Sequence, residues 1–492
     1  KVTSSVEISQ PAEVNNNAPS LTHKPRQASA PPGSSDDKPT RPEGFSAVQE
    51  VLFVLMICLS QMLMLAGLAQ AMVPAQIIGE SFPDSSRGMM AWYSAAYGLT
   101  SATFVLPSGR VGDLFGHKKI FIIGFLWLAF WSVLAGFARE VQGSGLHGNI
   151  YFCFCRAMQG IGPALQVPNG QALLGRTYTP GMRKNMVLCL FGASAPVGFV
   201  LGGIMASLFA VRGLWPWAFW TLGALCVALA TISIVVLPPP DKKTAHQRRQ
   251  QQATGQLWTH LDGYGMVLGV SGLVLFNFAF NQAPIVSWTT PYTYFILIIG
   301  TMLIAAFVRH ECRSSTQYPL VPITAMKSAT NFVLGCTGAG WGCFGIWVYY
   351  TFSFLQLSRG WSPLLASISF VHGVLVGVLI TRVKPHWIML ISMASFFIGS
   401  LLLATAPVDQ SYWFNTFFGI LVMPFATIML SNSVSKEHQG IAASLVVTTV
   451  NYSYDPSLTN NPPDLPIQSP HILLYPFPSY STRIFPEADH RI

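Results

Sequence analysis

Two ionisable side chains lie next to or inside long apolar runs, and they are the first candidates for chemistry. Arg156 falls inside such a run, and Asp113 lies in a short polar stretch between two of them. An arginine in a hydrocarbon layer costs at least about 2.5 kcal/mol, so Arg156 is expected to face protein or water and to have a function. A carboxylate near the carboxyl end of a helix meets the negative end of the helix dipole, so Asp113 needs a cationic partner.

The polar stretch 109–119 reads Gly-Arg-Val-Gly-Asp-Leu-Phe-Gly-His-Lys-Lys. We expect these eleven residues to form a hinge that turns the chain around at a membrane surface. The three glycines permit the tight reversal and close helix contact, and the lysines favour the cytoplasmic side of a membrane. We interpret the stretch as a conformational latch, because a carboxylate in so unfavourable a place needs a partner. The alternative is an ordinary positively charged loop. The latch residues are Gly109, Asp113, Gly116, Lys118 and Lys119.

Proton coupling would have to use few groups, because every acid outside the tails lies at the end of an apolar run or in a loop. The candidates are Arg156, Gln159 on the same helix face, and His372 in a later run; otherwise Asp113 would take part, or proton coupling would be missing. Alternatively, Arg156 has a structural role and extends its charged group to the membrane interface, and His372 is a hydrogen-bonded packing residue.

A glycine-rich segment at 192–203 is the third candidate. Gly198 and Gly202 are four residues apart, which is typical of close helix packing, and Pro196 predicts a kink just before them. Gly203 directly follows Gly202 and adds to this helix surface of glycines. The alternative is that the glycines serve packing only.

Aromatic and amide side chains inside the apolar runs are candidates for a substrate cavity between two helical bundles. Many such residues serve packing or lie at the membrane interface instead. The candidates are Trp92, Tyr97, Gln166, Trp341, Trp347 and Tyr350; Asn277 and Asn281 are weaker, because their run belongs to an inserted pair.

The composition defines the class of protein that positions these residues. Of 492 residues, 10% are charged and 51% are hydrophobic, whereas soluble proteins have about 25% charged residues. This indicates an all-α polytopic membrane protein. The net charge of +9 is spread among short loops, which excludes a nucleic-acid partner. The cysteines have no Cys-x-x-Cys pair, so neither a disulfide framework nor a metal site is predicted.

Twelve complete apolar spans divide the chain into segments. We expect a disordered cytoplasmic tail at 1–46, a six-helix N-terminal bundle at 47–237 and a cytoplasmic linker at 238–260. Two inserted spans at 261–310 precede a C-terminal bundle at 311–454. Lys and Arg in alternate loops favour a cytoplasmic N-terminus by four to one.

The C-terminal part of the sequence predicts an incomplete bundle. A thirteenth span begins at Glu437, but residues 455–492 are rich in proline and cannot cross hydrocarbon. We therefore expect the C-terminal bundle to be truncated, this exact chain to be unstable or inactive, and a functional gene product to continue past Tyr454 with a helical, glycine-rich sequence.

Three features resemble the signatures of the major facilitator superfamily: the 109–119 stretch, the run Arg156-Ala-Met-Gln-Gly-Ile-Gly, and the 192–203 segment. Together with the two extra spans, the region from about Val48 to Tyr454 resembles the fungal fourteen-span drug:proton antiporters, in the branch of aminotriazole resistance, low-affinity ammonium transport and secondary-metabolite efflux. Leu114 and His117 depart from the usual basic residues of the latch.

The resemblance implies two helical bundles with two inserted spans and a proton-coupled transporter, most simply an exporter of drugs, toxins or metabolites. The alternatives are low-affinity uptake of a small solute such as ammonium, a non-transporting receptor, or a truncated inactive transporter. We expect no enzyme activity, cofactor or metal, and a monomer that contacts a small-molecule substrate, protons and the lipid bilayer. The expected location is the plasma membrane.

Overall fold

The structure is a computed structural model. It describes residues 45–83, 85–145, 147–179, 181–239, 257–286, 288–313, 320, 328–371, 385–407 and 410–432. Every regular element in these ranges is a helix, which confirms the all-α prediction. His372, the run from Glu437 and the 455–492 tail lie outside the described residues, as do most of the 1–46 tail and of the linker. The domain boundaries stay a prediction.

Two helices of the N-terminal half begin with a serine cap. The side chain of Ser46 accepts a hydrogen bond from the Gln49 N–H, and Ser86 accepts one from the Met89 N–H. The helices are α1 (Ala47–Met72), α2 (Ala75–Gly79), α3 (Arg87–Phe115), α4 (His117–Gly136), α5 (Ala138–Gly143), α6 (Gly148–Thr177), α7 (Met182–Ala210) and α8 (Trp215–Val236).

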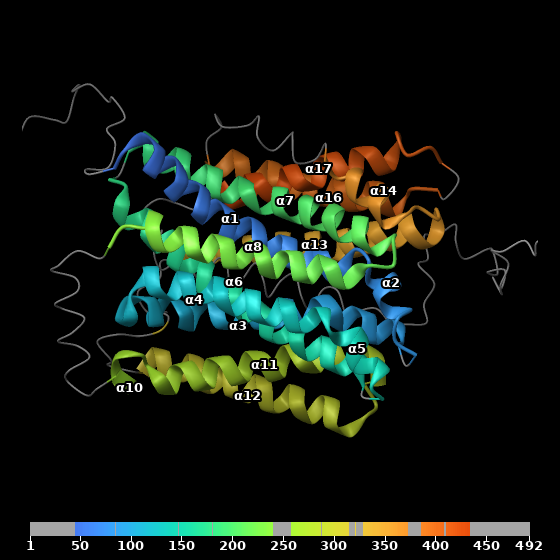
Figure 1. Cartoon of the computed structure of the whole chain (residues 1–492), viewed down its shortest axis with the longest axis horizontal. Helices are drawn as coiled ribbons and strands as arrows, with labels where there is room; N and C mark the ends of the chain where they lie inside the picture. The colour runs from blue at the N-terminus through green and yellow to red at the C-terminus, as the bar shows by residue number, and fades with distance from the viewer. Residues whose placement is uncertain are drawn as a thin grey trace, which may run out of the picture. The chain divides into compact units, whose positions relative to one another are not determined.

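The described residues after α8 form both short and long helices. They are α10 (Leu257–His260), α11 (Gly263–Val286), α12 (Pro291–Arg313), α13 (Ser328–Ser353), the π-helical η2 (Phe354–Ser358), α14 (Pro363–Ile368), α16 (Pro385–Ala404) and α17 (Asn415–Asn432). The predicted inserted pair, α11 and α12, packs side by side, and α11 also contacts α3 (Figure 1). Gly300 allows the close approach, because a Cβ there would lie 2.6 Å from the Phe276 nitrogen.

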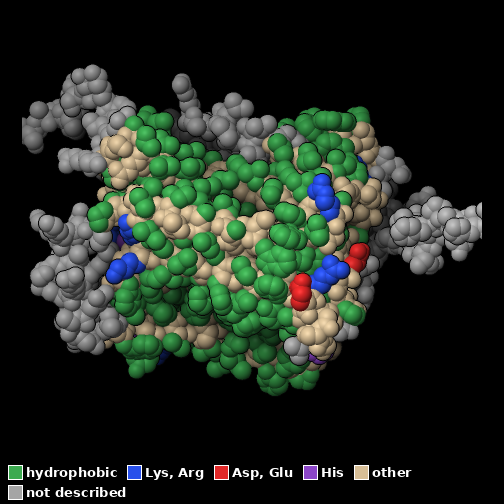
Figure 2. Space-filling view, in the orientation of Figure 1, with side chains coloured by type: hydrophobic (Ala, Val, Ile, Leu, Met, Phe, Trp, Pro, Cys, Tyr) green, Lys and Arg blue, Asp and Glu red, His purple; other side chains and the backbone are tan. Residues whose placement is uncertain are grey.

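The helix surfaces fit a lipid environment. Within the described residues, six helical stretches are long and apolar enough to cross a membrane by length and composition. Hydrophobic side chains cover most of the visible face, and the charged groups on it lie toward the two ends of the helices (Figure 2). This distribution is the one expected when the middle of each helix contacts hydrocarbon.

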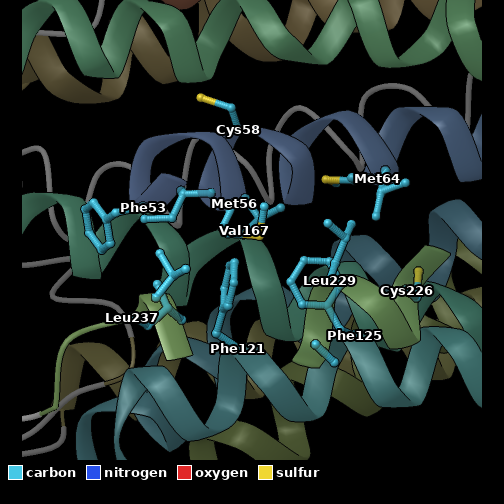
Figure 3. Close-up of a cluster of buried hydrophobic side chains, with 14 of the residues drawn as sticks. Phe53, Met56, Cys58, Met64, Phe121, Phe125, Val167, Cys226, Leu229 and Leu237 are labelled. Carbon is cyan, nitrogen blue, oxygen red and sulfur yellow. The ribbon is translucent and has the colours of Figure 1, made fainter. Parts of the chain in front are cut away.

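An apolar cluster packs several of the N-terminal helices together (Figure 3). The cluster includes Phe53 of α1, Phe121 and Phe125 of α4, Val167 of α6 and Leu229 of α8. Helix α1 begins near Glu50 and α8 begins at Trp215, and these two helix starts lie at opposite ends of the N-terminal helices (Figure 1). We call these the Glu50 end and the Trp215 end.

A second apolar cluster joins the two halves. It contains Leu68, Tyr97 and Phe199 from the N-terminal half, and Trp347 and Phe370 from the later helices. In addition, the side-chain amide of Gln356 donates a hydrogen bond of 3.1 Å to the Val73 carbonyl. The halves therefore meet through α1, α3 and α7 toward the Trp215 end.

Candidate functional site

Arg156 lies fully buried on α6 and links three helices. Its Nε donates to the Tyr93 carbonyl of α3 at 2.8 Å, and its Nη2 donates to the Gly67 carbonyl of α1 at 2.6 Å. The guanidinium carbon lies 4.5 Å from the centre of the Tyr97 ring, which adds a cation–π contact. The guanidinium makes no ion pair with a carboxylate of the described chain, so its charge is stabilised by dipoles and a ring.

Gln159 extends this network to α4. Its Oε1 accepts a hydrogen bond of 2.6 Å from Arg156 Nη1, and its Nε2 donates to Ser132 Oγ at 2.7 Å. The structure thus brings together two of the three predicted proton-coupling residues. Gln166 also faces α4, where a Cβ on Gly124 would lie 2.7 Å from its Cγ, and both of its polar side-chain atoms are buried without a hydrogen-bond partner.

The 109–119 stretch differs from the predicted hinge. Helix α3 continues through Asp113 to Phe115, and the chain reverses at Gly116, where φ is 106°. The prediction of an eleven-residue turn was wrong, because a single glycine in this conformation suffices to end one helix before the next begins. A Cβ on Gly109 would meet nothing within 4 Å, so close packing does not require that glycine.

Asp113 finds cationic partners in its own half. One of its oxygens, Oδ1, lies 3.1 Å from Arg176 Nη2 of α6 and 3.3 Å from His117 Nε2 of α4. Burial raises the pKa of Asp113, but His117, Arg176 and Arg110 outweigh it and leave the pKa below its usual value. The predicted need for a cationic partner is thus met in this state within the N-terminal helices.

Of the two latch lysines, Lys118 has a defined structural partner. Its Nζ donates to the Ile234 carbonyl at 2.8 Å and to the Leu237 carbonyl at the end of α8. A cation at the carboxyl end of a helix complements the helix dipole. Lys119 is exposed.

Sequence reasoning missed a buried ion pair at the same end. Glu50, in the first turn of α1, accepts hydrogen bonds from Arg183 Nε at 2.8 Å and from Arg183 Nη2. The Tyr178 hydroxyl donates to the same carboxylate at 2.9 Å. The only sequence signal was an acid at the start of a span, and its partner follows 133 residues later.

A second missed cluster joins the ends of the inserted pair. Asp262, just before α11, is buried and lies 3.0 Å from His310 Nε2 of α12. The Leu320 N–H donates to both Asp262 and Glu311, at 3.3 and 3.2 Å. Burial raises the pKa of Asp262, but hydrogen bonds from His310 and Glu311 outweigh it and lower the pKa overall.

The glycines of α7 pack against two partners. A Cβ on Gly198 would lie 2.1 Å from the Met62 carbonyl oxygen, and one on Gly202 would lie 2.4 Å from the Ala66 Cα, both on α1. A Cβ on Gly203 would lie 3.1 Å from Ser367 Oγ, in the later half. Helix α7, which continues through Pro196, therefore contacts its own half and the opposite one.

The predicted cavity residues lie in several environments. Tyr97 and Trp347 belong to the cluster that joins the halves, and the indole nitrogen of Trp347 is buried without a partner. Trp92 packs on Phe278 of α11 at 5.3 Å between ring centres, and Tyr350 is half-buried beside Tyr349. The side chain of Trp341 lies outside the described residues. Their assignment to a substrate cavity stays a prediction.

Comparison with known proteins identifies relatives along most of this chain. It is 47% identical over 424 residues to the low affinity ammonium transporter of Saccharomyces cerevisiae, covering 83% of this chain and 80% of that protein. It is 39% identical over 439 residues to efflux pump terJ of Aspergillus terreus, covering 86% and 82%. It is 33% identical over 441 residues to the aminotriazole resistance protein of S. cerevisiae, covering 85% and 78%.

The fold is also similar to that of solved transporter structures. A crystal structure of a POT family transporter in complex with 5-aminolevulinic acid aligns with a TM-score of 0.56 at 12% identity, covering 85% of this chain and 91% of that one. Residues 52–454 match the family model of the Major Facilitator Superfamily. The chain is therefore a multi-pass membrane transporter that belongs to the Major Facilitator Superfamily.

Proposed function

We propose that this chain is a proton-coupled secondary transporter that exports drugs, toxins or small metabolites by antiport. The observation that carries the proposal is the packing of α7, whose Gly198 and Gly202 contact α1 while Gly203 contacts Ser367 of the other half. A helix that is packed tightly on its own half and lies against the opposite half can couple the movement of one to the other. The efflux-pump relative supports export.

In the proposed cycle, the two halves rock about a central substrate site. The apolar cluster and the Gln356–Val73 hydrogen bond hold the Trp215 end together in one state. Arg156 and Gln159 would respond to proton binding through the network that links α1, α3, α4 and α6, with His372 as the further candidate. Asp113 would form the latch at the Glu50 end.

The surroundings of the transporter follow from its charge pattern. The proposed orientation places the N-terminus and the Glu50 end in the cytoplasm, because the alternate loops that include Lys118 and Lys119 are rich in basic residues. We propose a monomer in the plasma membrane, whose partners are a small-molecule substrate, protons and lipid.

The second candidate function is low-affinity uptake of a small solute such as ammonium. The 47% identity to the yeast low affinity ammonium transporter favours this alternative. A receptor without transport, or an inactive transporter, is the third alternative.

A flux assay separates these functions. The full chain is reconstituted in sealed vesicles, and movement of a panel of hydrophobic drugs and of labelled methylammonium is followed under an imposed pH gradient. Antiport predicts that the drug moves in the direction opposite to proton flow, and that this drug movement stops when a protonophore is added. Movement of methylammonium without any drug movement would replace export by uptake, and movement of no probe would favour the receptor.

A further inference from the structure

His117 occupies an unusual position between two oxygen atoms. It is buried at the start of α4, with Nδ1 2.7 Å from Asn169 Oδ1 of α6 and Nε2 3.3 Å from Asp113 Oδ1 of α3. The ring therefore bridges the two helices that hold the Asp113 latch.

The neighbouring contacts fix which ring nitrogen carries hydrogen. Asn169 Nδ2 donates to the Leu165 carbonyl at 2.8 Å and to the Ser108 carbonyl at 3.2 Å, so its oxygen must face the histidine. That oxygen can only accept, and His117 Nδ1 must therefore donate. A Cβ on Gly112 would lie 1.7 Å from Asn169 Oδ1 and 2.6 Å from His117 Nδ1, so the glycine is needed to bring the two groups together.

The charge of the ring then decides its contact with Asp113. In the neutral ring with hydrogen on Nδ1, Nε2 presents a lone pair to a carboxylate oxygen, and the two repel. In the imidazolium, both nitrogens donate, and Nε2 can bond to Asp113. In the structure Nε2 has no regular hydrogen bond, although the carboxylate is its nearest ionic contact.

The other charged groups around the ring come from three helices. Asp113 and Arg110 come from α3, Arg176 from α6, and Lys118 and Lys119 from α4 itself. The described part of α8 contributes only carbonyl oxygens to Lys118 at this place. Because the pKa of Asp113 is lowered, its carboxylate stays ionised, and histidine is the side chain that ordinarily titrates between about pH 5 and pH 8.

We propose that His117 makes the Asp113 latch sensitive to pH at the Glu50 end. The protonated ring holds Asp113 in its own half together with Arg176, whereas loss of the proton removes one of these cations and leaves Asp113 able to pair elsewhere. The inference rests on the latch role of Asp113 in the proposed function and adds a proton as its ligand.

Distance measurements between spin labels test the proposal on the full chain in lipid nanodiscs. Labels are placed at Met182→Cys and Leu390→Cys, exposed positions in the two halves, after Cys189→Ser and Cys312→Ser remove the exposed thiols. Between about pH 5 and pH 8 we expect the distance distribution to shift. His117→Arg should stay in the low-pH distribution, and His117→Gln should stay in the high-pH one.

The control is His147→Gln, at an exposed histidine in the loop before α6, and it should keep the shift. Absence of a shift in the parent protein, or a shift that persists in both His117 variants, would overturn the proposal. The measurement needs neither substrate nor flux, so a failed flux assay with an intact pH shift would overturn only the proposed export function.

Discussion

Arg156 combines a fixed charge with neutral partners. The carbonyls of Gly67 and Tyr93 and the amide of Gln159 orient the guanidinium without neutralising it. Three donors that point to three different groups use the planar shape of arginine, which an ammonium cannot reproduce. The residue thus depends on geometry as well as on charge, and substitutions can separate the two.

We expect Arg156→Lys and Arg156→Gln both to reduce transport at least about tenfold, since lysine loses the fork and glutamine loses the charge. Flux in sealed vesicles is the measurement, with Arg139→Gln, an exposed arginine on α5, as the matched control. Full transport in Arg156→Gln would leave Arg156 with a structural role only. Thermal unfolding must show that each variant is folded.

Asp113→Asn should release the latch contact with Arg176. Because both groups are about half exposed, the ion pair contributes about 0.2–1 kcal/mol, and the conformational equilibrium should shift up to about fivefold. Accessibility of cysteines placed at the Glu50 end and at the Trp215 end measures the shift, with the exposed Glu140→Gln as control. Accessibility and transport equal to those of the parent would contradict the latch.

The lowered pKa of Asp113 predicts how that contact depends on pH. A carboxylate with a lowered pKa in the folded protein contributes stability above its ordinary pKa, and the contribution is lost as pH falls through the lowered value. On the acid side, the Asp113–Arg176 contact should therefore break only as pH falls through the lowered pKa of Asp113. A difference in cysteine accessibility between the parent and Asp113→Asn that disappears near neutral pH would contradict this order.

At the scale of helices, α7 offers a matched pair of glycines. A Cβ on Gly198 would collide with the α1 backbone, whereas a Cβ on Gly192 would meet nothing within 4 Å. Gly198→Ala should destabilise the protein by about 1–3 kcal/mol through overpacking, whereas Gly192→Ala should be neutral or slightly stabilising. Thermal unfolding in detergent compares them, and equal unfolding temperatures would exclude a packing role for Gly198.

The apolar runs in the sequence predicted the helices well. Helix α8 at Trp215–Val236, for example, coincides with the last apolar run of the predicted 47–237 bundle, because a long apolar run has few other solutions in lipid. The polar contacts between helices could not be predicted in the same way. The partner of Asp113 could not be predicted, since Arg176 lies 63 residues away and its place depends on how α3 packs on α6. For the same reason Asn169, which fixes His117, had no sequence signal.

At the scale of the molecule, the two halves touch where α7 meets α14. The Cβ of Ser367 lies 3.6 Å from the position of a Cβ on Gly203, within the range that a disulfide requires. If the halves separate at the Trp215 end in every cycle, a covalent bond there must stop transport. A crosslink between the two residues therefore tests directly whether the halves separate at this end.

Gly203→Cys with Ser367→Cys should form a disulfide under oxidation, abolish transport, and regain transport when the bond is reduced. The matched control joins two helices of one half: Gly419→Cys with Leu402→Cys, where the corresponding Cβ distance is 3.7 Å, should leave transport unchanged. Flux with and without reductant, and gel mobility after proteolysis between the halves, provide the readouts. Transport that continues with the Gly203–Ser367 crosslink formed would show that the Trp215 end need not open, and the rocking mechanism would be wrong.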